Sequence, residues 1–156
     1  MIGPYFEGGV CLDLFAGSGA LGLEALSRGM DFAVFVDRKS GDTIKRNVDR
    51  LNATSVVRLM PFHYEKAIRQ LIGAYMFDLV FLDPPYAEGL LPSAMTWLVK
   101  GQLLRDGAIV VAEMDRATPS PEIPSLELVK CQDYGGTRVC IYQKVQQQEE
   151  EVEVLR

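Results

Sequence analysis

An Asp-Pro-Pro-Tyr segment directly follows an apolar run, and it carries the residues best suited to chemistry: Asp83, Pro84, Pro85 and Tyr86. The run predicts a buried strand. Each proline fixes its φ angle and lacks a backbone N–H, so the segment after the strand is stiff. It holds a carboxylate, bare carbonyl oxygens and an aromatic ring in fixed relation. Carboxylate and carbonyl oxygens accept hydrogen bonds from N–H groups, and an aromatic ring stacks on a base. The segment therefore predicts a site that binds a planar exocyclic amino group.

A second candidate site is the glycine pattern Gly17-x-Gly19-x-x-Gly22, which follows a predicted strand and opens a predicted helix. Asp37 lies 20 residues after the first glycine, the spacing expected of a carboxylate that binds ribose hydroxyls. The pattern predicts a cofactor that contains adenosine, and taken alone it fits a nicotinamide dinucleotide equally well.

Two features favour a cofactor other than a dinucleotide. Asp13 stands at the end of the strand before the glycines, where a carboxylate suits a charged amino group better than a pyrophosphate. The chain has one histidine, His63, and no second domain for an oxidoreductase substrate. We interpret His63, at the start of a predicted helix, as structural, with no catalytic role.

The elements that must position these residues alternate between apolar strands and amphipathic helices, which is typical of a parallel sheet covered on both faces. Strands are predicted at 10–15, 32–36, 56–60, 77–82 and 108–112, and helices at 20–27, after Ser40, at 64–72 and at 92–99. Residues 126–134 and 137–144 flank Gly135-Gly136 and predict an antiparallel hairpin. The expected fold is α/β, with a doubly wound, mostly parallel sheet closed by this hairpin. Ligands of such sheets bind beyond the carboxyl ends of the strands, where Asp13–Gly19, Asp37 and Asp83–Tyr86 all lie.

Length and composition fit a single globular domain. The chain has 156 residues, of which 48% are hydrophobic, and we assign residues 1–145 to one domain and 146–156 to an acidic tail expected to be disordered. The net charge of −5 falls to −2 without the last eight residues. This charge does not exclude an RNA partner, but it supplies no basic surface for one.

The cysteines and apolar runs bear on location. Cys11, Cys131 and Cys140 are an odd number at no metal-binding spacing and lie in apolar runs, so we expect reduced core residues of a cytoplasmic protein and no metal site. No apolar run approaches the roughly 18 residues that a membrane span requires.

With both motifs, the chain resembles the S-adenosylmethionine-dependent amino-methyltransferases, and more closely the bacterial 16S ribosomal RNA guanine-N2 methyltransferases. The resemblance covers roughly residues 1–144. It rests on Leu12–Gly19, Leu23–Gly29, Phe77–Tyr86 and Tyr134-Gly135, and the run Glu24–Gly29 is what narrows it. It implies a Rossmann-like class I methyltransferase fold with a seven-stranded sheet.

The resemblance also implies a role for each site residue. Asp13, Gly17 and Gly19 would line the methionine part of S-adenosyl-L-methionine, and Asp37 would bind its ribose. Asp83 and the Pro84 carbonyl would accept hydrogen bonds from the guanine N2 amino group, with Tyr86 stacked on the base. The remaining candidates are neighbours of these residues: Phe15, Ala16, Ser18 and Arg38 for the cofactor and Pro85 for the amine. The implied partner is 16S ribosomal RNA or the assembling small subunit, bound by a monomer.

The chain departs from the family pattern in two places. The family's third strand usually ends in an acid near the adenine, whereas here the segment reads Met60-Pro61-Phe62-His63, and we expect Phe62 to pack on the adenine instead. Family members also have an upstream segment rich in Arg, Pro and Thr that closes over cofactor and RNA. The first residues, Met1–Phe6, resemble a stretch that follows that segment. A chain without it would still bind cofactor, with weaker RNA binding and slower turnover.

Three other functions remain open on the sequence. One is transfer of a methyl group to an adenine amino group in DNA or RNA. Another is a cofactor-binding module without activity that serves as a partner domain. A dinucleotide-dependent oxidoreductase is the last of them.

Overall fold

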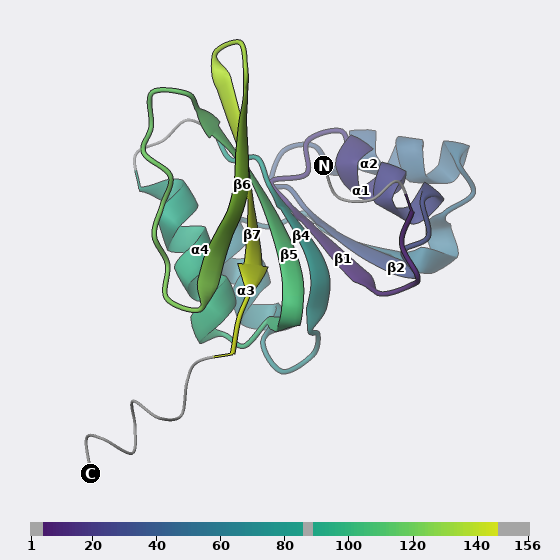
Figure 1. Ribbon diagram of the computed structural model, residues 1–156. Coiled ribbons are helices and arrows are strands. Elements are labelled where there is room, and N and C mark those ends of the chain that lie inside the picture. Colours follow the sequence, from purple (N-terminus) through teal and green to yellow (C-terminus); the bar gives the residue numbers. More distant parts are fainter. Residues whose placement is uncertain (1–4, 86–88, 147–156) are drawn as a thin grey trace.

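The computed structural model describes residues 5–85 and 89–146, and Tyr86 and the predicted tail beyond residue 146 lie outside this range. Seven strands form one sheet in the order β3-β2-β1-β4-β5-β7-β6. The strands are β1 (Val10–Leu14), β2 (Phe32–Val36), β3 (Val57–Met60), β4 (Phe77–Leu82), β5 (Leu104–Asp115), β6 (Leu126–Tyr134) and β7 (Thr137–Lys144). The first five are parallel, and β7 and β6 are antiparallel at one edge. The predicted doubly wound α/β sheet with a closing hairpin is confirmed (Figure 1).

Helices cover both faces of this sheet, because each carries one apolar stripe that must be buried. On one face, α1 (Ala20–Ser27) and α2 (Gly41–Arg50) pack their buried residues into one hydrophobic cluster. On the other, α3 (Tyr64–Leu71) and α4 (Leu90–Lys100) pack into the second and larger cluster. A short 3-10 helix, η1 (Thr54–Val56), precedes β3. The two cores hold the sheet rigid between them and so fix the ends of its strands.

Most predicted boundaries are met to within one residue, and the largest differences have local reasons. β1 ends at Leu14 rather than Phe15, because Phe15 adopts a left-handed backbone with φ 69°. α4 begins at Leu90 rather than Pro92, since Gly89 caps the helix and a proline is tolerated in the first turn. β5 extends well beyond the predicted 108–112. A register shift between Phe77 and Leu79 lets its first residues pair with β4, and its last residues pair with β7.

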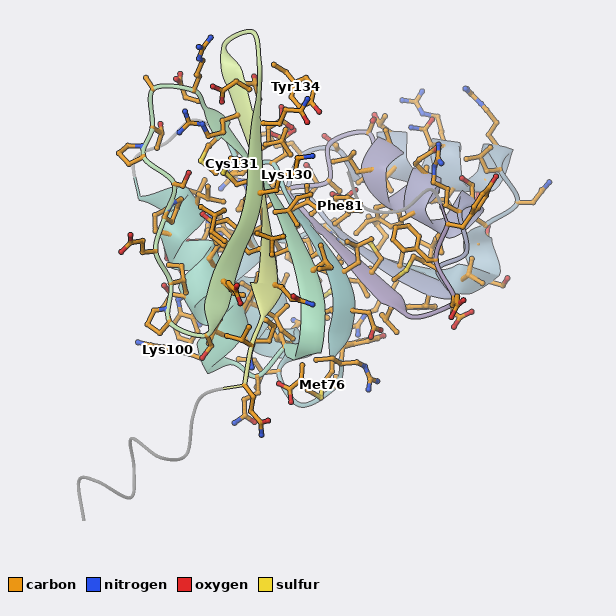
Figure 2. All side chains as sticks on the ribbon, in the orientation of Figure 1. Met76, Phe81, Lys100, Lys130, Cys131 and Tyr134 are labelled. Carbon is orange, nitrogen blue, oxygen red and sulfur yellow. A yellow bond between two sulfur atoms is a disulfide. The ribbon has the colours of Figure 1, made fainter. Side chains whose placement is uncertain are left out.

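The β6–β7 hairpin extends past the ends of the other strands and corrects one expectation about the cysteines (Figure 1). Cys131 and Cys140 are cross-strand partners and form a disulfide, with 4.1 Å between their Cα atoms. The expectation that both are reduced is therefore wrong. Cys140 is buried in the core as expected, but Cys131 is exposed on β6 (Figure 2). Cys11 is free and buried in β1, as expected.

In the part of the chain that the structure describes, no helix is both long and apolar enough to cross a membrane.

Candidate functional site

A cavity of about 780 Å³ opens at the carboxyl ends of β1, β2 and β4, where the strand order reverses between β1 and β4. Ligands of doubly wound sheets bind at this position. Of the predicted site residues, the lining includes Asp13, Phe15, Ala16, Gly17, Ser18, Asp37, Arg38, Phe62, Asp83, Pro84 and Pro85. Two motifs that are some 70 residues apart in the sequence thus face one cavity. Gly19 is buried and is not among the residues that line the cavity. Tyr86, with its predicted stacking role, falls outside the described residues.

The glycine loop is held by backbone geometry and by hydrogen bonds from two neighbouring elements. Gly17 and Gly19 have φ angles of 58° and 82°, in the left-handed region that glycine tolerates best. The backbone N–H of Ala16 donates to the carbonyl of Val36 at 2.8 Å, and the Asn47 side-chain amide of α2 donates to the carbonyl of Ser18 at 2.8 Å. The loop is therefore fastened to β2 and to α2 before any ligand binds.

Asp37, the residue after β2, links the glycine loop to the turn formed by residues 37–40. One carboxylate oxygen accepts from the Gly17 N–H at 2.8 Å, and the other accepts from Lys39 and Ser40 N–H groups at 2.9 and 2.8 Å. Partial burial would raise the pKa of Asp37, but these N–H donors outweigh it and hold the pKa below its usual value. Since an oxygen can accept two hydrogen bonds, the oxygen bound to Gly17 keeps capacity for a ligand hydroxyl.

Asp13 is the buried charged group of the site, with a relative exposure of 2%. Its carboxyl accepts from the backbone N–H of Gly22, in the first turn of α1, at 3.0 Å. Burial raises the pKa of Asp13 to about 7, and the negative charges of Asp83 and Asp37 add to this, while the Gly22 hydrogen bond opposes it. Asp13 thus both caps α1 and presents a carboxyl group with a near-neutral pKa to the cavity.

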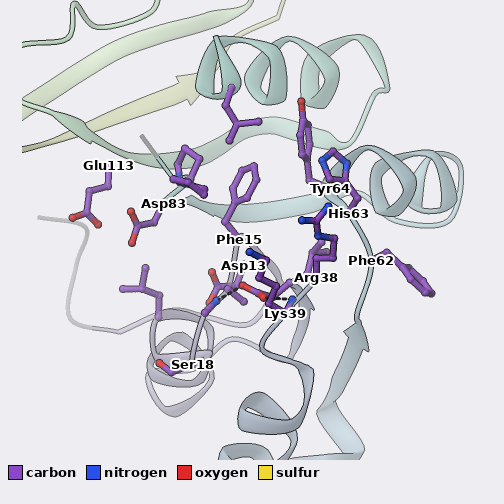
Figure 3. A pocket seen from close by; sticks show the side chains of 18 of the residues that line it. Asp13, Phe15, Ser18, Arg38, Lys39, Phe62, His63, Tyr64, Asp83 and Glu113 are labelled. Atoms are coloured by element: carbon purple, nitrogen blue, oxygen red, sulfur yellow. Dashed lines mark hydrogen bonds between the residues drawn. The ribbon is translucent and has the colours of Figure 1, made fainter. Parts of the chain in front are cut away.

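Asp83 and Glu113 form a pair of carboxyl groups on the other side of the cavity (Figure 3). The two carboxyl groups are close enough for each to influence the pKa of the other. Burial raises the pKa of both groups, and for Glu113 the neighbouring Asp83 raises it further. Pro84, next to Asp83, is buried, so the acid stands on a fixed support.

The basic and aromatic groups lie away from this acid pair. Figure 3 shows Arg38 and His63 across the cavity from Asp83 and Glu113. The His63 imidazole accepts from the Glu65 N–H at 3.4 Å and caps α3, which is the structural position we expected for it. The Phe62 ring points away from the centre of the cavity, and the Lys66 ammonium lies 4.5 Å from its centroid. Its predicted stacking on an adenine stays a prediction that requires the ring to turn.

Sequence reasoning missed several side chains that line the cavity, among them Tyr64 and Glu113. Tyr64, the first residue of α3, packs on Phe15 with 5.2 Å between ring centroids. Glu113 lies near the end of β5, beside the Asp83 segment that follows β4. The signal for Glu113 was available: the argument that placed Asp83 at the carboxyl edge applies equally to an acid that follows the apolar run 108–112.

Comparison with known proteins places this chain in one family. The family described as conserved hypothetical protein 95 matches residues 1–143. "Putative rRNA methyltransferase YlbH" of Bacillus subtilis is 43% identical over 92% of this chain and 80% of its own length. Ribosomal RNA small subunit methyltransferase D of Haemophilus influenzae is 31% identical over 90% of this chain and 74% of its own.

Solved structures agree with these relatives. A conserved hypothetical protein of Streptococcus pyogenes superposes with a TM-score of 0.86 at 43% identity, covering 92% of this chain and 91% of that one. An O-methyltransferase family protein from Burkholderia thailandensis, at 12% identity and a TM-score of 0.69, covers 89% of this chain and 52% of its own and shares the fold alone. The chain has the Rossmann-like fold of methyltransferases and belongs to the conserved hypothetical protein 95 family, with proteins named ribosomal RNA small subunit methyltransferase D among its homologues.

Proposed function

We propose that this protein is an S-adenosyl-L-methionine-dependent RNA methyltransferase that modifies the exocyclic N2 of a guanine in 16S ribosomal RNA. The observation that carries the proposal is that the glycine loop and the Asp83-Pro84-Pro85 segment line one cavity. The volume of about 780 Å³ lies within the range of about 300–1,000 Å³ for small-molecule sites. A cofactor and an amine can therefore meet in it.

The glycine-loop side of the cavity suits this cofactor. S-adenosyl-L-methionine supplies an electrophilic methyl group on a sulfonium centre and carries an ammonium group. We assign the ammonium to the Asp13 carboxylate, the methionine chain to Phe15–Gly19, the ribose to Asp37 and the adenosine edge to Arg38 and Phe62. Asp13 is suited to its role because a buried carboxyl group with a pKa of about 7 ionises readily beside a cation.

The acid pair suits the amine. An exocyclic amine is a poor nucleophile because its lone pair is delocalised into the ring. Asp83 and the Pro84 carbonyl accept its N–H groups and draw the nitrogen towards tetrahedral geometry, which frees the lone pair. Positive charge would build on that nitrogen as the N–C bond forms and the bond from the methyl group to sulfur breaks, and the fixed Asp83 carboxylate would stabilise this charge. The leaving group would be the neutral thioether S-adenosylhomocysteine, and the extra N–H proton would leave by way of Asp83 to solvent. Pro85 stiffens the segment, and we assign stacking on the base to Tyr86.

The same acids disfavour a dinucleotide. A pyrophosphate at a glycine loop uses the N–H groups of the following helix. Here the Asp13 carboxyl group already takes the Gly22 N–H, and Asp83 and Glu113 place further negative charge in the cavity. A pyrophosphate in this position would be repelled.

Homologues named rRNA small subunit methyltransferases support ribosomal RNA as the substrate. We accordingly propose 16S ribosomal RNA or the assembling small subunit as the partner, bound by a monomer in the cytoplasm. The amine is assigned to guanine N2 on the sequence resemblance, and adenine N6 is the competing outcome of the test.

The test combines binding with transfer. Calorimetry should detect binding of S-adenosylhomocysteine and no binding of NAD. Labelled methyl groups should pass from the cofactor to small subunits that lack the modification, so that the labelled nucleotide can be mapped. Asp83→Ala should lower the transfer rate by about 10²–10³-fold while cofactor affinity is kept. The matched control is Asp106→Ala, because Asp106 lies near the amino end of β5, far from the carboxyl ends that carry the cavity, and forms an ion pair with Lys144. Tight NAD binding, or a wild-type rate in Asp83→Ala, would refute the proposal.

A further inference from the structure

Glu113 is a second carboxyl group at the amine side of the cavity, and neither the glycine loop nor the proline segment accounts for it. Leu82 of β4 and Ala112 of β5 are register partners in parallel strands. Asp83, which directly follows β4, and Glu113 of β5 are therefore the next residues at the same end of the sheet. Both side chains line the cavity and lie on the same side of it (Figure 3). The site therefore offers two carboxyl groups side by side.

Two adjacent carboxyl groups fit a ligand with two adjacent donors. An ionised carboxylate only accepts hydrogen bonds, so two carboxylates side by side need donors from a ligand or from water. Asp83 is exposed and Glu113 is partly exposed, so a ligand can reach both. A ligand with two neighbouring N–H groups can donate one hydrogen bond to each carboxylate.

Guanine presents such a pair of donors. Its Watson–Crick edge carries N1–H beside the N2 amino group, whereas adenine and cytosine place an unprotonated ring nitrogen beside their amino group. A carboxylate that faces an unprotonated ring nitrogen gains no hydrogen bond and is repelled by its lone pair.

We propose that Glu113 accepts a hydrogen bond from guanine N1–H while Asp83 accepts from N2, and that Glu113 thereby selects guanine. This inference rests on the proposed methyl transfer to guanine N2 and names the residue that decides the base. It requires no residue outside those described.

The test uses a base that keeps the amine and lacks the ring donor. 2-Aminopurine has the N2 amino group but no N1–H. Small subunits are reconstituted with 16S ribosomal RNA ligated to carry guanine or 2-aminopurine at the mapped nucleotide. We expect the wild-type protein to prefer guanine by about tenfold or more in kcat/KM, because one hydrogen bond to a charged group is lost. Glu113→Gln should shrink this preference to about threefold or less, since an amide can either accept from N1–H or donate to N1.

Two further variants complete the design. Glu113→Ala should lose rate on guanine and keep its rate on 2-aminopurine, and Glu127→Gln, an exposed glutamate on β6, should behave as wild type. Equal losses on both bases in the Glu113 variants, or an unchanged preference in Glu113→Gln, would overturn the inference. Absence of any transfer to guanine by the wild-type protein would instead refute the proposed function itself.

Discussion

At the scale of single residues, the site is dominated by acids whose pKa values diverge. Asp37 has a lowered pKa, because backbone N–H groups stabilise its charge. The pKa is raised for Asp13, Asp83 and Glu113, because burial disfavours the charged form of each carboxyl group. Groups with perturbed pKa values that gather in one cavity are typical of functional sites. The sequence predicted three of these four acids from their positions after apolar runs, but it held no information on their protonation, which depends on burial and contacts.

Asp13 yields a prediction on pH. Its ionised form attracts the cofactor's ammonium, and its pKa in the free protein is about 7, so cofactor affinity should rise with pH through this value. If only the ionised form binds, affinity for S-adenosylhomocysteine should increase roughly eightfold between about pH 6 and about pH 7.5. Calorimetry across this range measures the slope.

Matched variants isolate Asp13 within the acid cluster. Asp13→Asn can still accept the Gly22 N–H through its amide oxygen, so α1 should stay capped while the pH slope disappears. Glu113→Gln should keep the slope. A slope of wild-type size in Asp13→Asn would show that another group binds the ammonium.

At the scale of elements, the glycine loop works because α1 packs very close to the sheet. A Cβ atom built at Gly22 would lie 2.8 Å from Cζ of Phe35 on β2 and 3.3 Å from Cβ of Asp13. The spacing of the glycines predicted this loop and its helix. It did not predict that the third glycine also places its N–H on Asp13, since that depends on the approach of helix to strand.

Gly22→Ala should therefore push α1 away from Phe35. Overpacking costs about 1–3 kcal/mol, which exceeds the gain of up to about 1 kcal/mol from replacing a helical glycine. We expect a lower free energy of unfolding in urea titrations and weaker cofactor binding. Gly136→Ala, where an added Cβ meets nothing within 4 Å and φ is not positive, should change stability by less than about 0.5 kcal/mol. Equal stability of the two variants would contradict the close packing.

Element boundaries show where sequence patterns stop being informative. The strands flanking Gly135-Gly136 have their predicted limits because alternation and turn residues agree. β5 runs far beyond its apolar centre, since its ends are held by pairing with β4 and β7 rather than by burial. Pairing with distant strands leaves little trace in local composition.

At the scale of the whole molecule, the alternation of strands and helices was enough to predict the sheet, both covered faces and the edge that carries the site. The disulfide was missed although the hairpin prediction contained it. A two-residue turn at Gly135-Gly136 places Tyr134 opposite Thr137, and therefore Cys131 opposite Cys140. Assigning the cysteines from their odd number and their apolar surroundings, without the hairpin register, led to the wrong result.

The disulfide closes a short loop across the hairpin, with a sequence separation of 9. Loop closure of this size contributes about 2–3 kcal/mol, so reduction should lower the Tm. Thermal melts with and without dithiothreitol measure this shift, and Cys131→Ser should remove the dependence on reductant. In the denatured, unreduced protein we expect one reactive thiol, that of Cys11. Three reactive thiols before reduction would contradict the disulfide.

The whole molecule is also the scale at which the function is decided, because cofactor, amine and RNA meet only there. The most direct measurement is nucleoside mass spectrometry of small-subunit RNA after incubation with the protein and labelled S-adenosyl-L-methionine, using subunits that lack the modification. The proposed function predicts N2-methylguanosine at a single position, formed about 10²–10³-fold more slowly when Asp83→Ala replaces the wild-type protein. N6-methyladenosine as the product, or no methylated nucleoside from a protein that binds S-adenosylhomocysteine, would contradict it.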